Sequence, residues 1–267
     1  LTDGRPYGGI HVCIDLTKAL CTGLTLDFCT WGRVLSTQNR LGVSMVKDFQ
    51  QQRVVDHYDD HIQKLIPGYG LIHRQIHALL QAQLADDAKI LIVGCGTGYE
   101  VSYVLEQFPS AQITALDPSL NMIHKAKERL AEHPERHRVH FMHADTSALI
   151  DMHRYDAALV ILVAHFIAMP QKHNFFRDIY RSLKVGGCLL SYDLMQFKCV
   201  KQVHALQYFC QNNGLSLQQS QNMVDRIQQD FALIFPQQYE NILHDVGFSH
   251  VECYSKIMNY YAFQATK

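Results

Sequence analysis

A short apolar run that leads into three closely spaced glycines constrains this chain more than any other feature. Residues 89–100 read KILIVGCGTGYE, and residues 90–93 form a mostly β-branched run. Such a run is typical of a strand buried on both faces of a parallel sheet. Gly94, Gly96 and Gly98 tolerate positive φ and carry no Cβ that would obstruct a ligand. The pattern predicts a strand, a tight turn and a helix, with bare backbone N–H groups that suit a nucleotide-like cofactor.

The spacing of the glycines separates two classes of cofactor. Thr97 followed by Glu100 fits a capping box, which predicts that a helix starts here. A dinucleotide fingerprint needs glycine or alanine at position 99, where this chain has Tyr99. The pattern G-x-G-x-G instead resembles motif I of the class I S-adenosylmethionine (SAM) methyltransferases, whose cofactor has no phosphate. A dinucleotide site and a purely structural turn stay open at this point.

The composition narrows the class of partner. The 267 residues are 48% hydrophobic and 18% charged, with a net charge of −1. This balance predicts no broad footprint for nucleic acid, so a small-molecule substrate is favoured. No apolar run is long enough to span a bilayer, and the eight cysteines contain no C-x-x-C pair. We therefore expect reduced thiols, a cytoplasmic location and no membrane partner, while a homodimer stays open.

Three parts are expected along the chain. The composition of residues 1–44 differs from that of the sequence that follows. We interpret this segment as an extension, and whether it belongs to the functional protein stays open. Residues 45–88 predict a helical lid with a break at the Pro-Gly-Tyr-Gly turn of residues 67–70. Residues 89–267 form the cofactor-binding domain. A glutamine-rich stretch at about 195–230, broken at Asn212-Asn213-Gly214, predicts a helical cap on the substrate side.

Further strands alternate with helices after the glycine turn. We expect them at residues 111–116, 139–142, 155–167 and, after a turn at Gly186-Gly187, up to residue 194. Pro236 is expected to open a last helix that Gly247 ends. Residues 249–254 and 257–265 then predict an antiparallel pair. The fold class is α/β: a doubly wound, Rossmann-like seven-stranded sheet with N-terminal helices, a helical cap and an antiparallel last strand at the edge.

Two acids follow predicted strands. Asp117 ends the second strand about 20 residues beyond the glycines, where a carboxylate can accept hydrogen bonds from both ribose hydroxyls. The alternative is a helix N-cap. Asp145 follows the third strand, where it can accept a hydrogen bond from an adenine amino group or act as a turn residue. The neighbours of these acids are expected in the same site, namely Pro118, Ala144 and Thr146.

Histidines supply most candidates for proton transfer. His165 lies at the end of the fourth strand, where it faces substrate or is a packed histidine. His165, His57 and Tyr69 are candidate general bases, needed only if the acceptor loses a proton. Two i, i+4 pairs also occur, but neither has the glutamate of H-E-x-x-H nor a third ligand. We interpret both pairs as solvated helix faces and expect no metal; they are His57/His61 and His73/His77.

The order of motifs carries a family resemblance. GCGTG, LDPS, HADT, YDAALVILVAHFI and LKVGGCLLSYDL together resemble the class I SAM methyltransferase series. More closely, DDHIQKLIPGYGLI, NNGLS and HDVGFSHVECYSKIMNYYAF resemble the carboxy-SAM synthase family, which supports tRNA wobble-uridine modification. The resemblance implies SAM as the cofactor. It implies cofactor contacts at Tyr69, Gly94, Cys95, Gly96, Asp117 and Asp145, and we add Gly98 and Ile161 to this site.

The chain departs from that family at two positions. Ile161 replaces a family asparagine, and Gln211 stands where the arginine that pairs with the extra carboxylate of carboxy-SAM is expected. Glutamine lacks the charged, bidentate fork that recognises a carboxylate. In addition, Ile92 occupies a place where many methyltransferases carry an acid. The expected activity is methyl transfer to an unidentified small molecule. The alternatives are a carboxy-SAM synthase-like enzyme and a non-catalytic SAM-binding protein.

Overall fold

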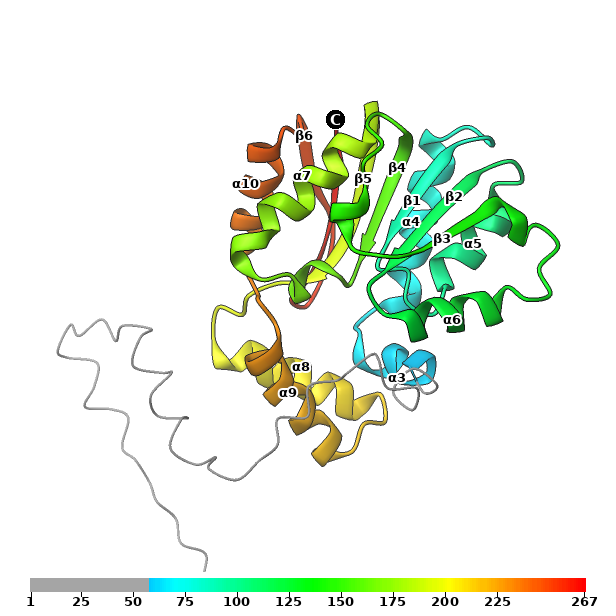
Figure 1. The fold of residues 1–267 in the computed structure, drawn as a ribbon. Helices are drawn as coiled ribbons and strands as arrows, with labels where there is room; N and C mark the ends of the chain where they lie inside the picture. The colour runs from blue at the N-terminus through cyan, green and yellow to red at the C-terminus, as the bar shows by residue number, and fades with distance from the viewer. Residues whose placement is uncertain (1–57) are drawn as a thin grey trace, which may run out of the picture. The chain divides into compact units, whose positions relative to one another are not determined.

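The computed structural model describes residues 58–267, which fold around one seven-stranded sheet (Figure 1). The expectations for residues 1–44, for the first part of the lid and for His57 lie outside the described residues. The strand order is β3-β2-β1-β4-β5-β7-β6. The strands are β1 Lys89–Val93, β2 Gln112–Asp117, β3 Val139–His143, β4 Tyr155–Ile161, β5 Leu183–Leu194, β6 His250–Ile257 and β7 Tyr260–Thr266.

Helices precede the sheet, connect its strands and form the cap. They are α3 Tyr58–Leu65, α4 Tyr69–Gln83, α5 Tyr99–Gln107, α6 Leu120–Arg129, α7 Lys172–Ser182, α8 Val200–Asn212, α9 Leu217–Asp230 and α10 Pro236–Val246. Each of these helices falls short of the length and apolar character that crossing a membrane requires. The predicted helical cap corresponds to α8 and α9, which Gly214 separates with a φ of 93°.

The predicted doubly wound sheet is confirmed, with one difference in the position of the reversed strand. Pairing is parallel from β3 through β5, whereas β7 is antiparallel to both β5 and β6. The reversed strand is therefore inserted between β5 and β6, and the expectation that it forms the edge is wrong. The reason is topological: α10 carries the chain past β5 to β6, and the hairpin then returns β7 into the gap.

Alternate residues of the central strands enter two separate cores. In β1, Ile90 and Ile92 belong to a core with residues of α4 and α5, whereas Leu91 and Val93 belong to a core with residues of α7 and α10. Because side chains alternate along a strand, helices must cover both faces of the sheet. The result is a layered α/β arrangement with the carboxyl ends of the parallel strands at one edge (Figure 1).

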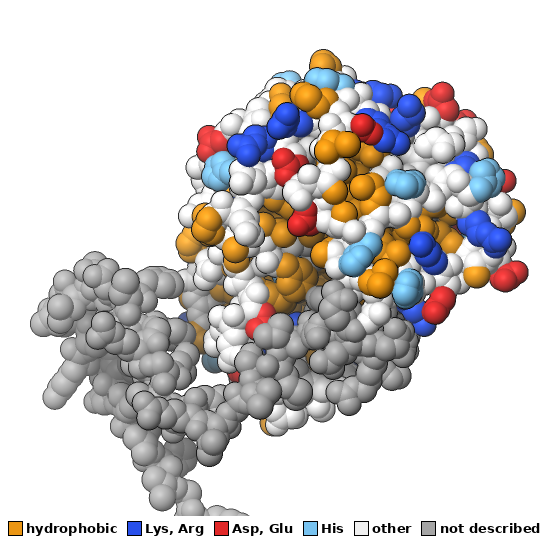
Figure 2. Space-filling model, in the orientation of Figure 1, with side chains coloured by type: hydrophobic (Ala, Val, Ile, Leu, Met, Phe, Trp, Pro, Cys, Tyr) orange, Lys and Arg blue, Asp and Glu red, His pale blue; other side chains and the backbone are white. Residues whose placement is uncertain are grey.

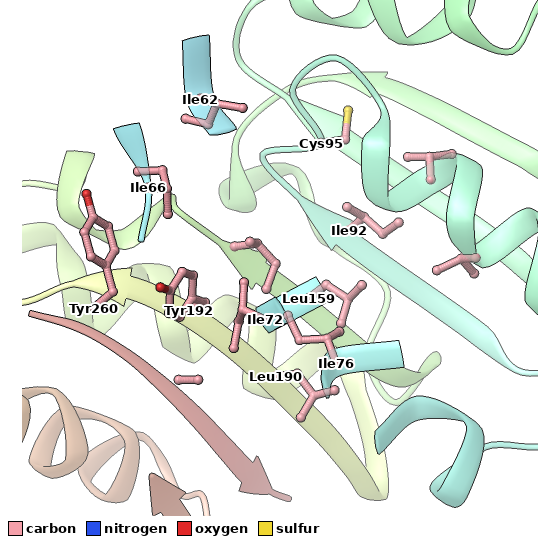
Figure 3. Close-up of a cluster of buried hydrophobic side chains, with 14 of the residues drawn as sticks. Ile62, Ile66, Ile72, Ile76, Ile92, Cys95, Leu159, Leu190, Tyr192 and Tyr260 are labelled. Atoms are coloured by element: carbon pink, nitrogen blue, oxygen red, sulfur yellow. The ribbon is translucent and has the colours of Figure 1, made fainter. Parts of the chain in front are cut away.

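The turn between α3 and α4 is fastened to the sheet. Gly68 adopts a left-handed conformation with a φ of 70° and is the N-cap of α4. The buried hydroxyl of Tyr192 in β5 donates to the carbonyl of Pro67 at 2.9 Å. Ile62 and Ile66, from α3 and the turn after it, pack in the same core as Tyr192 and Tyr260 (Figure 3). The expected break is confirmed, although Tyr69 and Gly70 belong to the second helix.

Two strand boundaries differ from expectation. β4 ends at Ile161 rather than at residue 167, because Leu162 has a φ of 60° and a short 3-10 helix, η5 Ala164–Phe166, follows. β5 begins before the two glycines rather than after them. Leu183 pairs with Tyr155 and Cys188 with Ala157, so the glycines form an irregularity within the strand.

Candidate functional site

The glycine loop joins β1 to α5 through three left-handed residues. Gly94, Gly96 and Gly98 have φ of 66°, 51° and 83°. Gly98 is the N-cap of α5 and has no side-chain cap. The predicted capping box of Thr97 and Glu100 is therefore wrong, because Glu100 is the second residue of the helix and its carboxylate bonds to another helix.

The backbone N–H groups of the loop are largely used within the protein. Cys95 N donates to the carbonyl of Leu116 at 3.0 Å, Gly96 N to the carboxylate of Asp117 at 3.0 Å, and Gly98 N to the carbonyl of Cys95 at 2.9 Å. The expectation of bare N–H groups is wrong at these three positions. A pyrophosphate needs such groups free beside a helix N-terminus. The loop geometry thus favours a cofactor without phosphate.

The three glycines differ in what lies beside them. A Cβ at Gly94 would meet the side chain of Val163, and one at Gly98 would lie 2.9 Å from the Cβ of Ala126. A Cβ at Gly96 would have no heavy atom within 4 Å. Gly94 and Gly98 are therefore required by close packing, whereas Gly96 borders open space where a ligand can approach the backbone.

Asp117 turns toward the glycine loop from the end of β2. Its Oδ2 accepts from Gly96 N, and its Oδ1 accepts from Ser119 N at 2.8 Å. The N-cap of α6 is Ser119, not Asp117. An ionised carboxylate has about four lone-pair sites, so two further hydrogen bonds fit on Asp117. Burial raises the pKa of this carboxyl, while the hydrogen bonds from Ser119 and Gly96 and the charge of His143 oppose the shift.

The end of β3 lies next to Asp117. Ala144 N donates to the carbonyl of Asp117 at 3.2 Å, and Nε2 of His143 donates to the carbonyl of Pro118 at 3.0 Å. The exposed Asp145 is the N-cap of the short 3-10 helix η4 Thr146–Ala148 and accepts from Ser147 N at 2.9 Å. Pro118, Ala144, Asp145 and the buried Thr146 are thus brought together at the edge that also carries Asp117.

Helix α4 contacts the first turn of α5, directly after the glycine loop, through an aromatic and charged cluster. His73 is 1% exposed; its Nε2 bonds to Oε1 of Glu100 at 2.7 Å and its Nδ1 to the carbonyl of Tyr69 at 2.7 Å. The ring centroids of Tyr69 and Tyr99 are 5.7 Å apart. Burial lowers the pKa of His73, but the hydrogen bond to Glu100, its charge and the carbonyl of Tyr69 outweigh this effect and raise the pKa.

His77 lies one turn further along α4 and stacks on the ring of Tyr103. Burial, with a smaller effect from His73, lowers the pKa of His77 to about 3. The interpretation of His73 and His77 as a solvated face is wrong, because α5 covers both. Within residues 58–267, no three histidine, cysteine or acidic side chains are grouped to hold a metal.

A cavity of about 190 Å³ lies between α3, α9 and the end of β4. Most of its lining is apolar, and the lining residues with polar side-chain atoms are His165, Gln219, Asn222, Arg226 and Tyr260. Leu162, whose backbone is left-handed, is part of the wall, and the next residue, Val163, packs on Gly94. This wall of the cavity therefore lies close to Gly94, the first residue of the glycine loop.

His165 is buried in the cavity wall and is held by Asp193 from the end of β5. Nδ1 of His165 donates to Oδ1 of Asp193, and the backbone N–H of His165 donates to Oδ2 at 3.1 Å. Because an ionised carboxylate only accepts, Nδ1 carries the proton and Nε2 keeps a lone pair in the neutral ring. The charge of Asp193 also faces the buried Lys172; burial lowers the pKa of Lys172, and Asp193 opposes the shift.

The residues that depart from the expected family pattern make contacts within the protein. Ile92 and Ile161 are 2% and 9% exposed and belong to the hydrophobic core. Gln211 in α8 donates to Ser220 of α9 at 2.8 Å and does not line the cavity. It joins the two cap helices instead.

Sequence reasoning missed Asp193 and Arg226. A signal existed for Asp193, which follows an apolar run at a strand end just as Asp117 does. The sequence signal for Arg226 was weaker. Arg226 stands among glutamines on a helix, and the sequence pattern did not state which face of that helix points toward the site. Cys95, expected in the site through its backbone, lies in the glycine loop, where its N–H donates to Leu116. Its thiol is buried, and burial together with the charges of Asp117 and Glu100 raises its pKa.

The sequence of this chain is similar to the sequences of known proteins. Residues 91–189 match the family described as a methyltransferase domain. The chain is 27% identical over 234 residues to a carboxy-S-adenosyl-L-methionine synthase from Shewanella halifaxensis, covering 83% of this chain and 94% of that protein. It is 34% identical over 121 residues to a malonyl-[acyl-carrier protein] O-methyltransferase from Priestia megaterium, covering 45% and 42% of the two chains.

Solved structures share the fold at low sequence identity. A phosphoethanolamine N-methyltransferase from Haemonchus contortus, in complex with phosphomonomethylethanolamine and S-adenosylhomocysteine, superposes with a TM-score of 0.61 at 17% identity. The match covers 81% of this chain and 58% of that one. At this identity the likeness concerns the fold.

Proposed function

We propose that residues 94–98 and Asp117 of this class I SAM-dependent methyltransferase bind SAM. We also propose that the cavity beside His165 binds a small methyl acceptor. The observation that carries this proposal is the hydrogen bond between Asp117 and Gly96 N, which places an acid and an open glycine side by side. Two lone-pair sites of Asp117 remain for ribose hydroxyls.

The rest of the cofactor site follows from the same edge of the sheet. Asp145, with Pro118, Ala144 and Thr146 around it, supports an adenine-binding position next to the ribose. Tyr69 lies on the other side, in ring contact with Tyr99 at the start of α5, which supports a contact with the methionine end of SAM. Ile161, buried at the end of β4, contributes an apolar surface.

Methyl transfer is an in-line displacement that depends mainly on alignment. SAM supplies a sulfonium whose methyl group is already electrophilic. Holding the acceptor in line is worth roughly 7–11 kcal/mol of the barrier. If the acceptor atom carries a proton, we assign its removal to Nε2 of His165, with Asp193 as the positioning residue that fixes the ring. The mixed charges on the face shown in Figure 2 agree with a small molecule rather than nucleic acid.

Calorimetry of the purified chain tests the cofactor assignment. We expect SAM and S-adenosylhomocysteine to bind and NADH not to bind. Asp117→Ala is expected to weaken SAM binding at least about tenfold, roughly 1.4 kcal/mol, because the ribose loses its acceptor. Asp151→Asn, which removes an exposed acid that pairs with Arg154, is the matched control. Binding of NADH without SAM, or unchanged affinity in Asp117→Ala, contradicts the proposal.

A second candidate is a carboxy-SAM synthase-like activity, favoured by the relatives of that name that match across 94% of their length. The contact of Gln211 with Ser220 weakens this candidate, since no charged fork is available there. Mass spectrometry of the ligand that co-purifies with the chain separates the two: carboxylated SAM favours the synthase, and plain SAM or S-adenosylhomocysteine favours methyl transfer. SAM binding without turnover of any acceptor favours a non-catalytic binder.

A further inference from the structure

The cavity beside His165 carries one cationic side chain on an otherwise uncharged wall. Of its described lining residues, the others with polar side-chain atoms are His165, Gln219, Asn222 and Tyr260. Arg226 is 25% exposed at its side chain and lies on the same face of α9 as Met223 and Ile227, which also line the cavity. A guanidinium in such surroundings is costly to bury without a partner.

Arg226 is only partly paired. Its Nε lies 3.3 Å from Oδ2 of Asp230, one turn further along α9. Asp230 does not line the cavity, so the wall presents the cation and not its partner. The two terminal Nη atoms of Arg226 donate no hydrogen bond to any group within residues 58–267. These atoms are the ones that hold a carboxylate in a bidentate pair.

We propose that the methyl acceptor is a small carboxylic acid with an apolar body, held by its carboxylate on Arg226. The inference rests on the proposed function, since it takes this cavity as the acceptor site. The volume of about 190 Å³ is below the roughly 300–1,000 Å³ of pockets that enclose drug-sized ligands, which limits the acid to a small one. A singly charged carboxylate matches the one positive charge of Arg226, whereas a phosphate dianion carries a second charge that this single cation does not balance.

The arrangement separates recognition from chemistry. Arg226 comes from α9, while His165 follows β4. An acid seated on Arg226 would lie along the apolar wall with its other end toward His165 and the glycine loop. In this arrangement the carboxylate positions the acceptor, and a different atom of the acceptor receives the methyl group.

The test is binding of hexanoate and of its neutral isostere hexanamide to the full chain saturated with S-adenosylhomocysteine, measured by calorimetry. We expect wild type to bind the acid at least about tenfold more tightly than the amide, and Arg226→Gln to lose this preference while keeping its affinity for S-adenosylhomocysteine. Arg154→Gln, which removes an exposed arginine that also pairs with an acid within its own segment, is the matched control and should keep the preference.

A second variant is expected to strengthen hexanoate binding rather than weaken it. Asp230→Asn removes the competing carboxylate and should tighten hexanoate binding several-fold without changing hexanamide binding. The inference is overturned if wild type binds neither probe, if it binds both equally, or if Arg226→Gln keeps the preference. Failure of wild type to bind S-adenosylhomocysteine would instead overturn the proposed function, so the two failures are distinguishable.

Discussion

Asp193 acts on a single imidazole, and its effect is measurable without knowledge of the acceptor. The carboxylate accepts from both Nδ1 and the backbone N–H of His165 and from Leu194 N at 2.9 Å. We predict that His165 is an Nδ1–H tautomer and that Asp193→Asn, which offers no charge to this proton, produces a mixture of tautomers. Long-range ¹H–¹⁵N NMR spectra of the His165 ring measure this, with Asp151→Asn as control. A wild-type ring protonated only at Nε2 contradicts the assignment.

Single residues were predictable where a motif fixed both their type and their place. Asp117 belongs to this class, since its distance from the glycines and its position at a strand end agree. The contacts of His73 were not predictable, because its partner Glu100 is 27 positions away and comes from the next helix. An i, i+4 spacing states which face of a helix two residues share, but not what covers that face.

At the scale of elements, α4 is held against α5 by the pair of His73 and Glu100. The pKa of His73 is raised above 6.5, so this pair contributes stability that is fully present below about pH 6.5 and is lost as the pH rises through the raised pKa. We predict that the free energy of unfolding of wild type falls over this upper window and that Glu100→Gln flattens the fall. Urea denaturation between about pH 4 and 9 measures it.

His77 on the same helix has the opposite dependence. Its pKa in the folded state is lowered to about 3, so the unfolded chain binds a proton that the folded chain rejects. Stability is therefore lost as the pH falls from about 6.5 toward 3. Glu100→Gln should leave this lower limb in place, which makes it an internal control. Equal slopes above pH 6.5 in wild type and Glu100→Gln contradict the role of the ion pair.

Element types were more predictable than element ends. The break before α4, the cap helices and α10 follow from Pro67-Gly68, Gly214, Pro236 and Gly247, because proline fixes φ and glycine readily adopts the left-handed conformation at helix ends. The end of β4 was not predictable, because Leu162 adopts a left-handed conformation that its residue type disfavours. Tertiary contacts supply the compensation: Leu162 N donates to the carbonyl of Tyr192 at 2.7 Å.

For the whole molecule, ligand binding should report on the folded state. The proposed cofactor site combines the ends of β1, β2 and β3 with α4, so we expect the unfolded chain not to bind the cofactor. We predict that S-adenosylhomocysteine at about 100 times its Kd raises the free energy of unfolding by about 2.7 kcal/mol, or Tm by about 5–11 °C. NADH at the same concentration should leave Tm unchanged. A thermal shift with NADH, or none with S-adenosylhomocysteine, contradicts the prediction.

The fold class was predictable because strands and helices alternate along residues 89–267 and the order of motifs is that of a known sheet. The insertion of β7 between β5 and β6 was not, since an antiparallel pair in the sequence does not state which member faces the rest of the sheet. The lid and cap were predicted as helices, but their joint lining of the cavity depends on packing between α3 and α9 that no local pattern encodes.

The inserted strand has a consequence for how the enzyme is made. Until β7 docks, β5 and β6 each expose an unpaired edge, a surface that invites pairing with other copies of the chain. The same strand brings Tyr260 into the cavity wall. Docking of β7 thus completes both the sheet and the pocket. Destabilising substitutions in this hairpin should therefore reduce the yield of folded protein rather than give a stable, inactive enzyme.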